Sequence, residues 1–316
     1  MKKVIVVIVA VLLVTVLIPL FTYIKNGKYE KPGPEAEETL NVYIKDEDRV
    51  IQMNKSQYLK EVVSAEMPAD FELEALKAQA VAARSYLESR RNAYKVSGTP
   101  EEHKGAEICT DSTHCKAWIS ENKRRELWGI DANKNWDKIS RAVTETEGQI
   151  ITYNGEVISA VFHSTSSGKT EASKDVWGGD KPYLVSVESP GDKESPKYKS
   201  NVQITLAEFK KLAEENIPEV DFSKGLIDGI KRSDAGGITE VTIGGVRIHG
   251  TKLRSIYGLR STNATIQIQG DTVIFDVTGY GHGVGMSQYG ANYMAKSGKD
   301  YREILTTYYQ GTEIIG

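Results

Sequence analysis

An uninterrupted apolar run near the start of the chain places the strongest constraint on how the rest can fold. Two lysines, Lys2 and Lys3, precede this run, which extends from Val4 to Ile24 without a charged residue. A run of about 21 residues is long enough to cross a hydrocarbon core of roughly 30 Å as a single helix. The lysines before it favour a cytoplasmic N-terminus. Everything after Lys25 is then expected outside the cytoplasmic membrane.

Two alternatives to a retained anchor fit this run less well. A cleaved signal peptide has a shorter apolar core and a cleavage site of small residues, which residues 22–24 do not provide. A buried core helix is disfavoured because no face of the run is polar. The sequence therefore predicts a transmembrane signal anchor at residues 1–25, a linker at 26–39 and an extracytoplasmic domain at 40–316.

The domain is predicted to be α+β, with a helical region packed against β-rich regions around an open substrate groove. Helices are expected where apolar residues recur at helical spacing. One helix is expected to begin at a cap, Asp70, and to run to about residue 87. The other expected helices are at residues 56–67, 134–146, 206–216, 287–296 and 301–309. Asn154-Gly155 predicts a hairpin with a type I′ turn. Several β-rich runs lie between residues 238 and 278, and an inserted lobe is expected near residues 190–235. A formal net charge of −3 and the lack of a nucleic-acid-binding motif disfavour nucleic acid as a partner.

The first segment with candidate chemistry surrounds Glu66, in Ser64-Ala-Glu-Met-Pro68. Glu66 ends an apolar helix just before a proline. A carboxylate partly desolvated in such a place has a raised pKa and suits a general acid; the alternative is a solvated residue at a helix end. Arg84 borders the apolar stripe of the next helix. It either snorkels to solvent or faces the same cleft and holds a polar substrate, and the spacing leaves both open.

Two loops carry further polar candidates. His163 and Ser164 begin a small polar loop that follows a strand, where functional residues often lie, although a surface turn is the simpler interpretation. No nucleophile elbow accompanies them, which disfavours a serine hydrolase. His282 stands between glycines that allow close approach of a ligand to the backbone. The glycine spacing matches neither a dinucleotide fingerprint nor a phosphate loop.

A fourth segment holds both cysteines of the chain and two of its five histidines: His103, Cys109, His114 and Cys115. Four such ligands within thirteen residues can close a tetrahedral zinc site, although the spacing fits no common finger pattern. The alternative is a Cys109–Cys115 disulfide, the default for two cysteines outside the membrane. Zinc is the favoured interpretation. A closed four-ligand site would be structural rather than catalytic.

Together these segments resemble the SpoIID domain. The resemblance extends from about residue 40 to the end and rests on six motifs in order: Ser64–Pro68, Ala75–Tyr86, His163–Gly168, Val176–Gly178, Pro182–Leu184 and Gly281–Ala291. It implies a single-pass membrane protein in the septal space of a sporulating bacterium. Its activity would be that of a lytic transglycosylase that degrades septal peptidoglycan during forespore engulfment and prefers glycan strands stripped of stem peptides. The implied partners are a SpoIIP-like amidase and a SpoIIM-like membrane protein.

The resemblance also implies roles for single residues. Glu66 corresponds to the catalytic acid, Arg84 to a position important for activity, and Tyr183 to a residue of the substrate groove. Further groups are expected to bind or orient the sugars: His163, Ser164, His282, Gln288 and Tyr289. One residue, Glu66, would act first as acid and then as base, in contrast to the two carboxylates of most glycosidases.

Three other functions compete with this one. A protein of the same fold could bind peptidoglycan without cutting it and activate a partner amidase. A zinc hydrolase could use His103, Cys109 and His114, but it would need an open coordination position and a general base. A septal scaffold held by partner contacts is the third.

Overall fold

The computed structural model describes residues 38–316. The predicted anchor at residues 1–25 and residues 26–37 of the predicted linker lie outside the described residues. Within residues 38–316, no helix is long and apolar enough to span a membrane. The described chain is a mixture of helices and several small sheets, so the predicted α+β class is confirmed.

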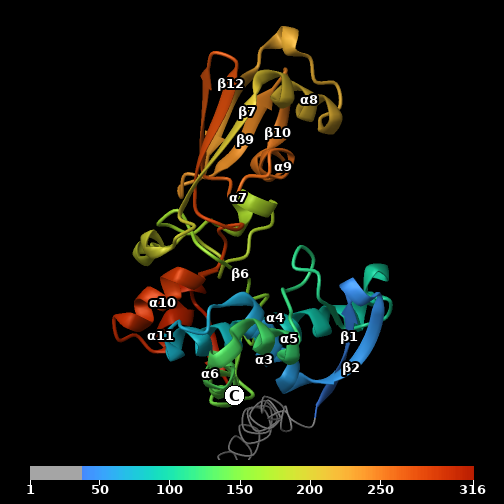
Figure 1. Ribbon diagram of the computed structural model, residues 1–316, viewed down its shortest axis with the longest axis vertical. Coiled ribbons are helices and arrows are strands. Elements are labelled where there is room, and N and C mark those ends of the chain that lie inside the picture. Colours follow the sequence, from blue (N-terminus) through green and yellow to red (C-terminus); the bar gives the residue numbers. More distant parts are fainter. Residues whose placement is uncertain (1–37) are drawn as a thin grey trace, which may run out of the picture. The chain divides into compact units, whose positions relative to one another are not determined.

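The first of two hydrophobic cores surrounds a long helix, α4 (Leu73–Ser97). Alanine, valine and leucine fill the first half of α4, which is buried on almost every side. Four other helices pack against it: α3 (Lys55–Glu66), α6 (Ala132–Thr144), α10 (Gln288–Lys296) and α11 (Tyr301–Tyr308). The early helices α3 and α4 therefore share a core with the last two helices of the chain (Figure 1).

The boundaries of these helices follow local chemistry. The side chain of Asn54 caps α3 by accepting a hydrogen bond from the N–H of Gln57, and Pro68 follows soon after its end. The prediction that Asp70 caps α4 is wrong: α4 begins after Glu72, whose side chain makes no capping bond. The N–H of Glu72 instead donates to Asn292 of α10, a tertiary contact that sequence spacing does not reveal.

Small sheets flank the first core. One consists of β1 (Thr39–Ile44), β2 (Arg49–Asn54) and β3 (Ile108–Cys109), and α5 (Glu121–Trp128) follows β3 in the chain. Another consists of β4 (Ile150–Tyr153), β5 (Glu156–Val157) and β14 (Glu313–Ile315). Asn154 and Gly155 both have positive φ, which confirms the predicted type I′ turn. The second strand of that hairpin is short and ends at Val157.

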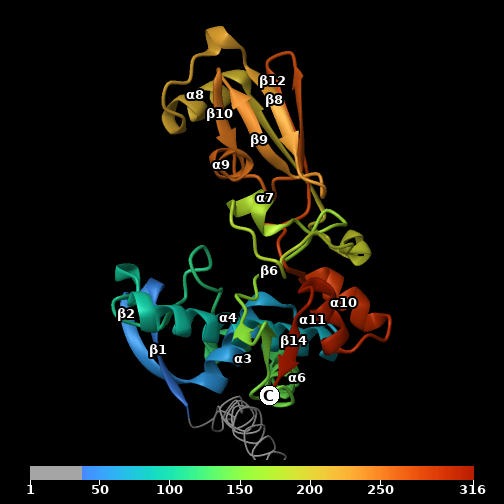
Figure 2. The same cartoon turned by 180° about the vertical axis from the view of Figure 1, so that it is seen from behind.

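The second core lies between Val202 and Val277 and belongs to a lobe of two three-stranded sheets and two helices (Figure 2). Its elements are β7 (Lys199–Thr205), α8 (Leu206–Asn216), β8 (Ile227–Arg232), β9 (Ile238–Ile243), β10 (Val246–His249), α9 (Gly250–Ile256), β11 (Ala264–Gln269) and β12 (Thr272–Thr278). Phe209 and Tyr257 stack at its centre with ring centroids 4.8 Å apart. The lobe expected near residues 190–235 overlaps this segment, but its core extends to Val277.

The two loops with polar candidates meet in a short parallel pair, β6 (Phe162–His163) with β13 (Met286–Ser287). Glycine makes this approach possible. Gly285 has φ +72°, and a Cβ there would stand 2.1 Å from the carbonyl oxygen of Val161. The helix α7 (Ser173–Trp177) lies between these strands in the sequence.

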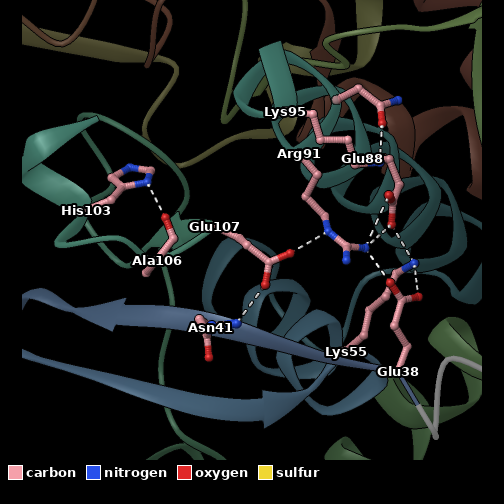
Figure 3. A network of polar contacts seen from close by, with 10 residues as sticks. Glu38, Asn41, Lys55, Glu88, Arg91, Lys95, His103, Ala106 and Glu107 are labelled. Atoms are coloured by element: carbon pink, nitrogen blue, oxygen red, sulfur yellow. Dashed lines mark hydrogen bonds and ion pairs between the residues drawn. The ribbon is translucent and has the colours of Figure 1, made fainter. Parts of the chain in front are cut away.

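An ion network fixes the beginning of the described chain against α4 (Figure 3). Arg91 pairs with Glu38, Glu88 and Glu107, and Lys55 pairs with Glu38 at 2.9 Å and with Glu88 at 2.5 Å. Glu107 also accepts the N–H of Asn41 on β1. This network ties β1 and the segment before β3 to the same helix.

Candidate functional site

A groove runs past the C-terminal end of α3. It consists of two hollows with volumes of about 1040 and 270 Å³. The residues that line both hollows are Ala65, Glu66, Ser164, Lys197 and Gln288. Glu66 therefore lies where the two hollows join, and we call the whole the Glu66 groove. A linear polymer bound along it would have chain on both sides of this carboxylate.

Glu66 is the last residue of α3 and is held by two donors. The backbone N–H of Ala117 donates to Oε1 at 3.0 Å, and the amide of Gln288 approaches Oε2 at 3.5 Å. Burial raises the pKa of Glu66, and the nearby charge of Lys116 and these two donors offset only part of that increase. The raised pKa predicted from the sequence is therefore supported by the environment of the side chain.

Lys116 is a buried cation that no motif in the sequence predicts. Its ammonium group lies 3.8 Å from the ring centroid of Phe162 and 4.3 Å from that of Tyr86. Burial lowers its pKa to about 8, although the charge of Glu66 acts in the opposite direction. Only the folded chain brings Lys116 to Glu66, since the residues are fifty positions apart and share no motif.

His163 and His282 line the larger hollow with their rings 5.6 Å apart. Nδ1 of His163 lies 3.1 Å from the carbonyl oxygen of Val284, and its buried Nε2 has no hydrogen-bond partner. Donation from Nδ1 leaves Nε2 as an acceptor for a hydroxyl or N–H group of a ligand. Burial lowers the pKa of His163 to about 4 and that of His282 well below its usual value, so both rings are neutral at neutral pH.

The other predicted groove residues come from several elements. Gln288, at the start of α10, is buried between Glu66 and Gln79. Ser164 lines both hollows, and Tyr289 lines the smaller one with its ring 5.0 Å from Phe71. Tyr183 lines the larger hollow and is 8% exposed. The structure therefore brings to the groove all six residues that were expected to line it or to bind sugars: His163, Ser164, Tyr183, His282, Gln288 and Tyr289.

Neither interpretation that the sequence left open for Arg84, a side chain that snorkels to solvent or one that faces the cleft and holds substrate, agrees with the structure. The side chain of Arg84 is fully buried and lines neither hollow. The guanidinium donates to the carbonyl oxygens of Val143 and Gln149, each at 3.2 Å. Arg84 therefore joins α4 to the end of α6 and the start of β4.

The Cys/His cluster borders the groove, because His114 and Cys115 line the larger hollow. The four ligand atoms of His103, Cys109, His114 and Cys115 all lie within 4.8 Å of one another. Nε2 of His103 is 3.0 Å from Nδ1 of His114 and 3.3 Å from the sulfur of Cys115. Tetrahedral zinc with nitrogen and sulfur ligands separates its ligand atoms by about 3.3–3.8 Å. The cluster could therefore hold a metal ion.

The protonation of His103 and Cys109 suits a metal, whereas the neighbouring Cys109 and burial raise the pKa of Cys115. Nδ1 of His103 lies 3.2 Å from the carbonyl oxygen of Ala106, which can fix its proton and leave Nε2 as the ligand atom (Figure 3). The thiol of Cys115 and the ring of His114 lower the pKa of Cys109 to about 5, although burial opposes them. Both cysteines are free thiols in this structure, so the disulfide alternative is not the arrangement seen.

The charge of the groove was not predicted from the sequence. Glu66 is the only carboxylate among the described residues that line either hollow. Six cationic side chains line the same surfaces: Arg90, Lys116, Arg124, Lys181, Lys197 and Arg254. These residues come from separate segments of the chain, so no run of basic residues in the sequence predicts a positively charged groove. Trp177 is a further groove residue, half-exposed, with its ring 5.1 Å from His282.

Comparison with known proteins identifies the family of the chain. A family model described as "Stage II sporulation protein" (SpoIID) matches residues 43–153. The chain is 37% identical to stage II sporulation protein D of Bacillus subtilis (strain 168) over 297 residues, 92% of this chain and 84% of that protein. It is also 37% identical over 258 residues to the protein of that name from Bacillus amyloliquefaciens, a match that covers 82% of this chain and 73% of that protein. The fold and the groove define an α+β protein with one carboxylate among the described residues that line an open groove. These sequence identities show that the chain belongs to the SpoIID family.

A further relative bears a different name. The chain is 29% identical over 310 residues to the "Amidase enhancer" of Bacillus subtilis (strain 168). The match covers 81% of this chain and 40% of that protein.

Arg84→Met should lower the free energy of unfolding by about 2–4 kcal/mol, because the buried carbonyls of Val143 and Gln149 each lose a donor. Chemical denaturation of the full-length protein measures this. Arg141→Met, at an exposed position of α6, is the matched control and should change stability by less than about 0.5 kcal/mol. Unchanged stability of Arg84→Met would contradict the assignment of Arg84 to the core.

Proposed function

We propose that the protein is a peptidoglycan lytic transglycosylase. It would cleave the MurNAc–GlcNAc linkage of peptide-stripped glycan strands and leave 1,6-anhydro-MurNAc ends. The observation that carries this proposal is that Glu66 is the one carboxylate lining the groove among the described residues. Hydrolytic glycosidases commonly use a second carboxylate, about 5–5.5 Å away as a nucleophile or about 6.5–9.5 Å away as a base for water. A lytic transglycosylase needs one, because a hydroxyl of the substrate replaces water.

The chemistry then follows from the position of Glu66. The protonated carboxyl gives its proton to the glycosidic oxygen as the bond from that oxygen to C1 of MurNAc breaks. The acetamido group of the same sugar stabilises the positive charge at C1. The Glu66 carboxylate next takes the proton of the C6 hydroxyl while O6 bonds to C1. The acid is regenerated and no water is consumed. A raised pKa suits a group that must first be protonated.

Other groove residues would bind and orient the strand. Nε2 of His163 is available to accept a hydroxyl proton. The amide of Gln288 contacts the catalytic carboxylate and would fix its orientation. Ser164, Tyr183, His282 and Tyr289 line the walls on either side. Arg84 is left out of this set because it does not reach the groove.

We also propose the setting that the family implies. Residues 1–25 would anchor the protein in the cell membrane, with the domain in the septal space of a sporulating cell during engulfment. A SpoIIP-like amidase would strip the stem peptides, and a SpoIIM-like membrane protein would complete the assembly. The ion for the Cys/His cluster would be zinc, held by two thiolates and two imidazoles in a structural role.

A second candidate function is activation of a partner amidase without cleavage. The 29% identity to the protein named amidase enhancer favours it. The presence of Glu66 in a groove favours catalysis instead. A zinc hydrolase is less consistent with the structure, because four closely spaced ligands leave no open position for water.

Incubation of the purified full-length protein with peptide-free glycan strands should give anhydro-MurNAc ends, detected by mass spectrometry. Glu66→Gln keeps the shape of the side chain but cannot transfer the proton, so we expect a rate loss of at least about 100-fold. Glu214→Gln, at an exposed position of α8, is the control and should cleave normally. Reducing ends would instead indicate a hydrolase, and binding without turnover would favour the amidase-activating function.

Lys116→Met should move the alkaline limb of the activity profile to higher pH. Activity requires protonated Glu66, so kcat/KM falls as the pH rises through its pKa. The charge of Lys116 lowers that pKa, and its removal therefore raises it. Methionine retains the apolar contacts with Phe162 and Tyr86. A limb that stays in place or moves to lower pH would show that Lys116 does not influence Glu66 in this way.

Zinc should bind the Cys/His cluster at one equivalent and raise the melting temperature of the metal-free protein, because a bound ligand stabilises the folded state. Elemental analysis and thermal unfolding measure the two effects. The Cys109→Ser variant should neither bind zinc nor show the rise in melting temperature. The Thr113→Ser variant, changed in the same loop, should do both. A disulfide that forms in place of metal binding, seen as two fewer titratable thiols, would contradict the zinc assignment.

A further inference from the structure

The Glu66 groove carries an excess of positive charge that no ion pair among the described residues neutralises. Six cations line it against one carboxylate. Within residues 38–316, none of the six forms an ion pair, although many lysines and arginines elsewhere in that range do, such as Lys77 with Glu145 and Lys231 with Glu240. Charges of one sign in a concave surface concentrate ligands of the opposite sign. The groove is therefore suited to an anionic ligand.

Three of these cations lie on the wall formed by the later part of the chain: Lys181, Lys197 and Arg254. Lys181 is exposed, and its backbone is held in a turn, where its N–H donates to the hydroxyl of buried Ser173. Lys197 is exposed and lines both hollows, with its ammonium group 5.1 Å from the ring centroid of Tyr280. Arg254 is half-buried, and its Nε donates to the carbonyl of Leu259. The ammonium groups of Lys181 and Lys197 thus form no ion pair within the described residues, whereas Arg254 uses its Nε within the protein.

The chemistry of the substrate identifies the anion. A glycan strand of the wall is uncharged except at the lactyl group of its muramic acid. That group is an amide when a stem peptide is attached and a free carboxylate when the peptide has been removed. Removal of peptides therefore creates one negative charge per disaccharide. Lysine and arginine form charge-assisted hydrogen bonds with carboxylates.

We propose that Lys181, Lys197 and Arg254 form a carboxylate-binding wall that recognises the free lactyl groups of peptide-stripped glycan. This inference rests on the proposed function and names the residues that would set its substrate preference. The half-exposed ring of Trp177 borders the same hollow and offers an apolar face on which a sugar can stack. Positive charge then selects stripped strands, and the aromatic ring binds either kind of strand.

The test compares two strands that differ only at the lactyl group. Peptide-free strands are used as they are, or after conversion of their carboxylates to methylamides. Binding is measured with full-length protein carrying Glu66→Gln, which prevents turnover. The protein should bind the free carboxylate form about tenfold more tightly, since each exposed ion pair contributes up to about 1 kcal/mol or about fivefold.

Lys181→Gln with Lys197→Gln should remove most of that difference. Affinity for the carboxylate strands should fall about tenfold, and affinity for the methylamide strands should stay within about twofold. Arg254 is left intact because its guanidinium also holds Leu259. The matched control is Lys199→Gln with Lys252→Gln, two exposed lysines that do not line the groove. It should leave both affinities unchanged.

Equal binding of the two strands by the Glu66→Gln protein would overturn the carboxylate-binding wall. An equal loss of affinity for both strands in the lysine variant would also overturn it, because charge recognition predicts a selective loss. In parallel, protein with Glu66 intact is offered both strands. Anhydro ends from both at equal rates would refute this inference and leave the proposed function standing. No anhydro ends from either would refute the proposed function together with it.

Discussion

The site depends on the contact between the end of α3 and the segment that follows the Cys/His cluster. There the backbone N–H of Ala117 donates to Glu66, and Lys116 brings a buried positive charge near the same carboxylate. Burial alone favours the neutral acid, whereas the donor and the charge favour the carboxylate. Burial has the larger effect, so the pKa of Glu66 is raised. Such a balance would suit the proposed role of Glu66, which gives one proton and then takes one.

The Cys/His cluster has a clear physical relation to this contact. Cys115 is the residue immediately before Lys116, so the last ligand of the cluster fixes the start of the segment that touches Glu66. A metal held by His103, Cys109, His114 and Cys115 would restrict the segment from His103 to Cys115, which includes β3 and the start of the loop before α5. A metal bound there would therefore order the segment that contacts Glu66.

The rest of the groove is assembled by close approach of distant backbone segments. The parallel pair of β6 and β13 places His163 beside the start of α10, from which Gln288 reaches Glu66. That pairing depends on Gly285, where a side chain would collide with the carbonyl of Val161. A buried carboxylate, Asp192, accepts hydrogen bonds from Ser166 and Ser287 and so joins the same two loops. Ser166 and Ser287 therefore hold the two loops in position through Asp192.

The sequence by itself determined the α+β class, the approximate ranges of most of the helices that it predicted and the type I′ turn, because apolar spacing and turn chemistry are local properties. It also singled out Glu66 and the four residues of the Cys/His cluster, since a proline-terminated helix and closely spaced ligands are visible in the chain. Only the tertiary structure decided that Arg84 lies in the core, that Lys116 approaches Glu66, and that Lys181, Lys197 and Arg254 share one wall. Burial and the sum of charges in a groove arise from contacts between distant segments, and no local pattern encodes them.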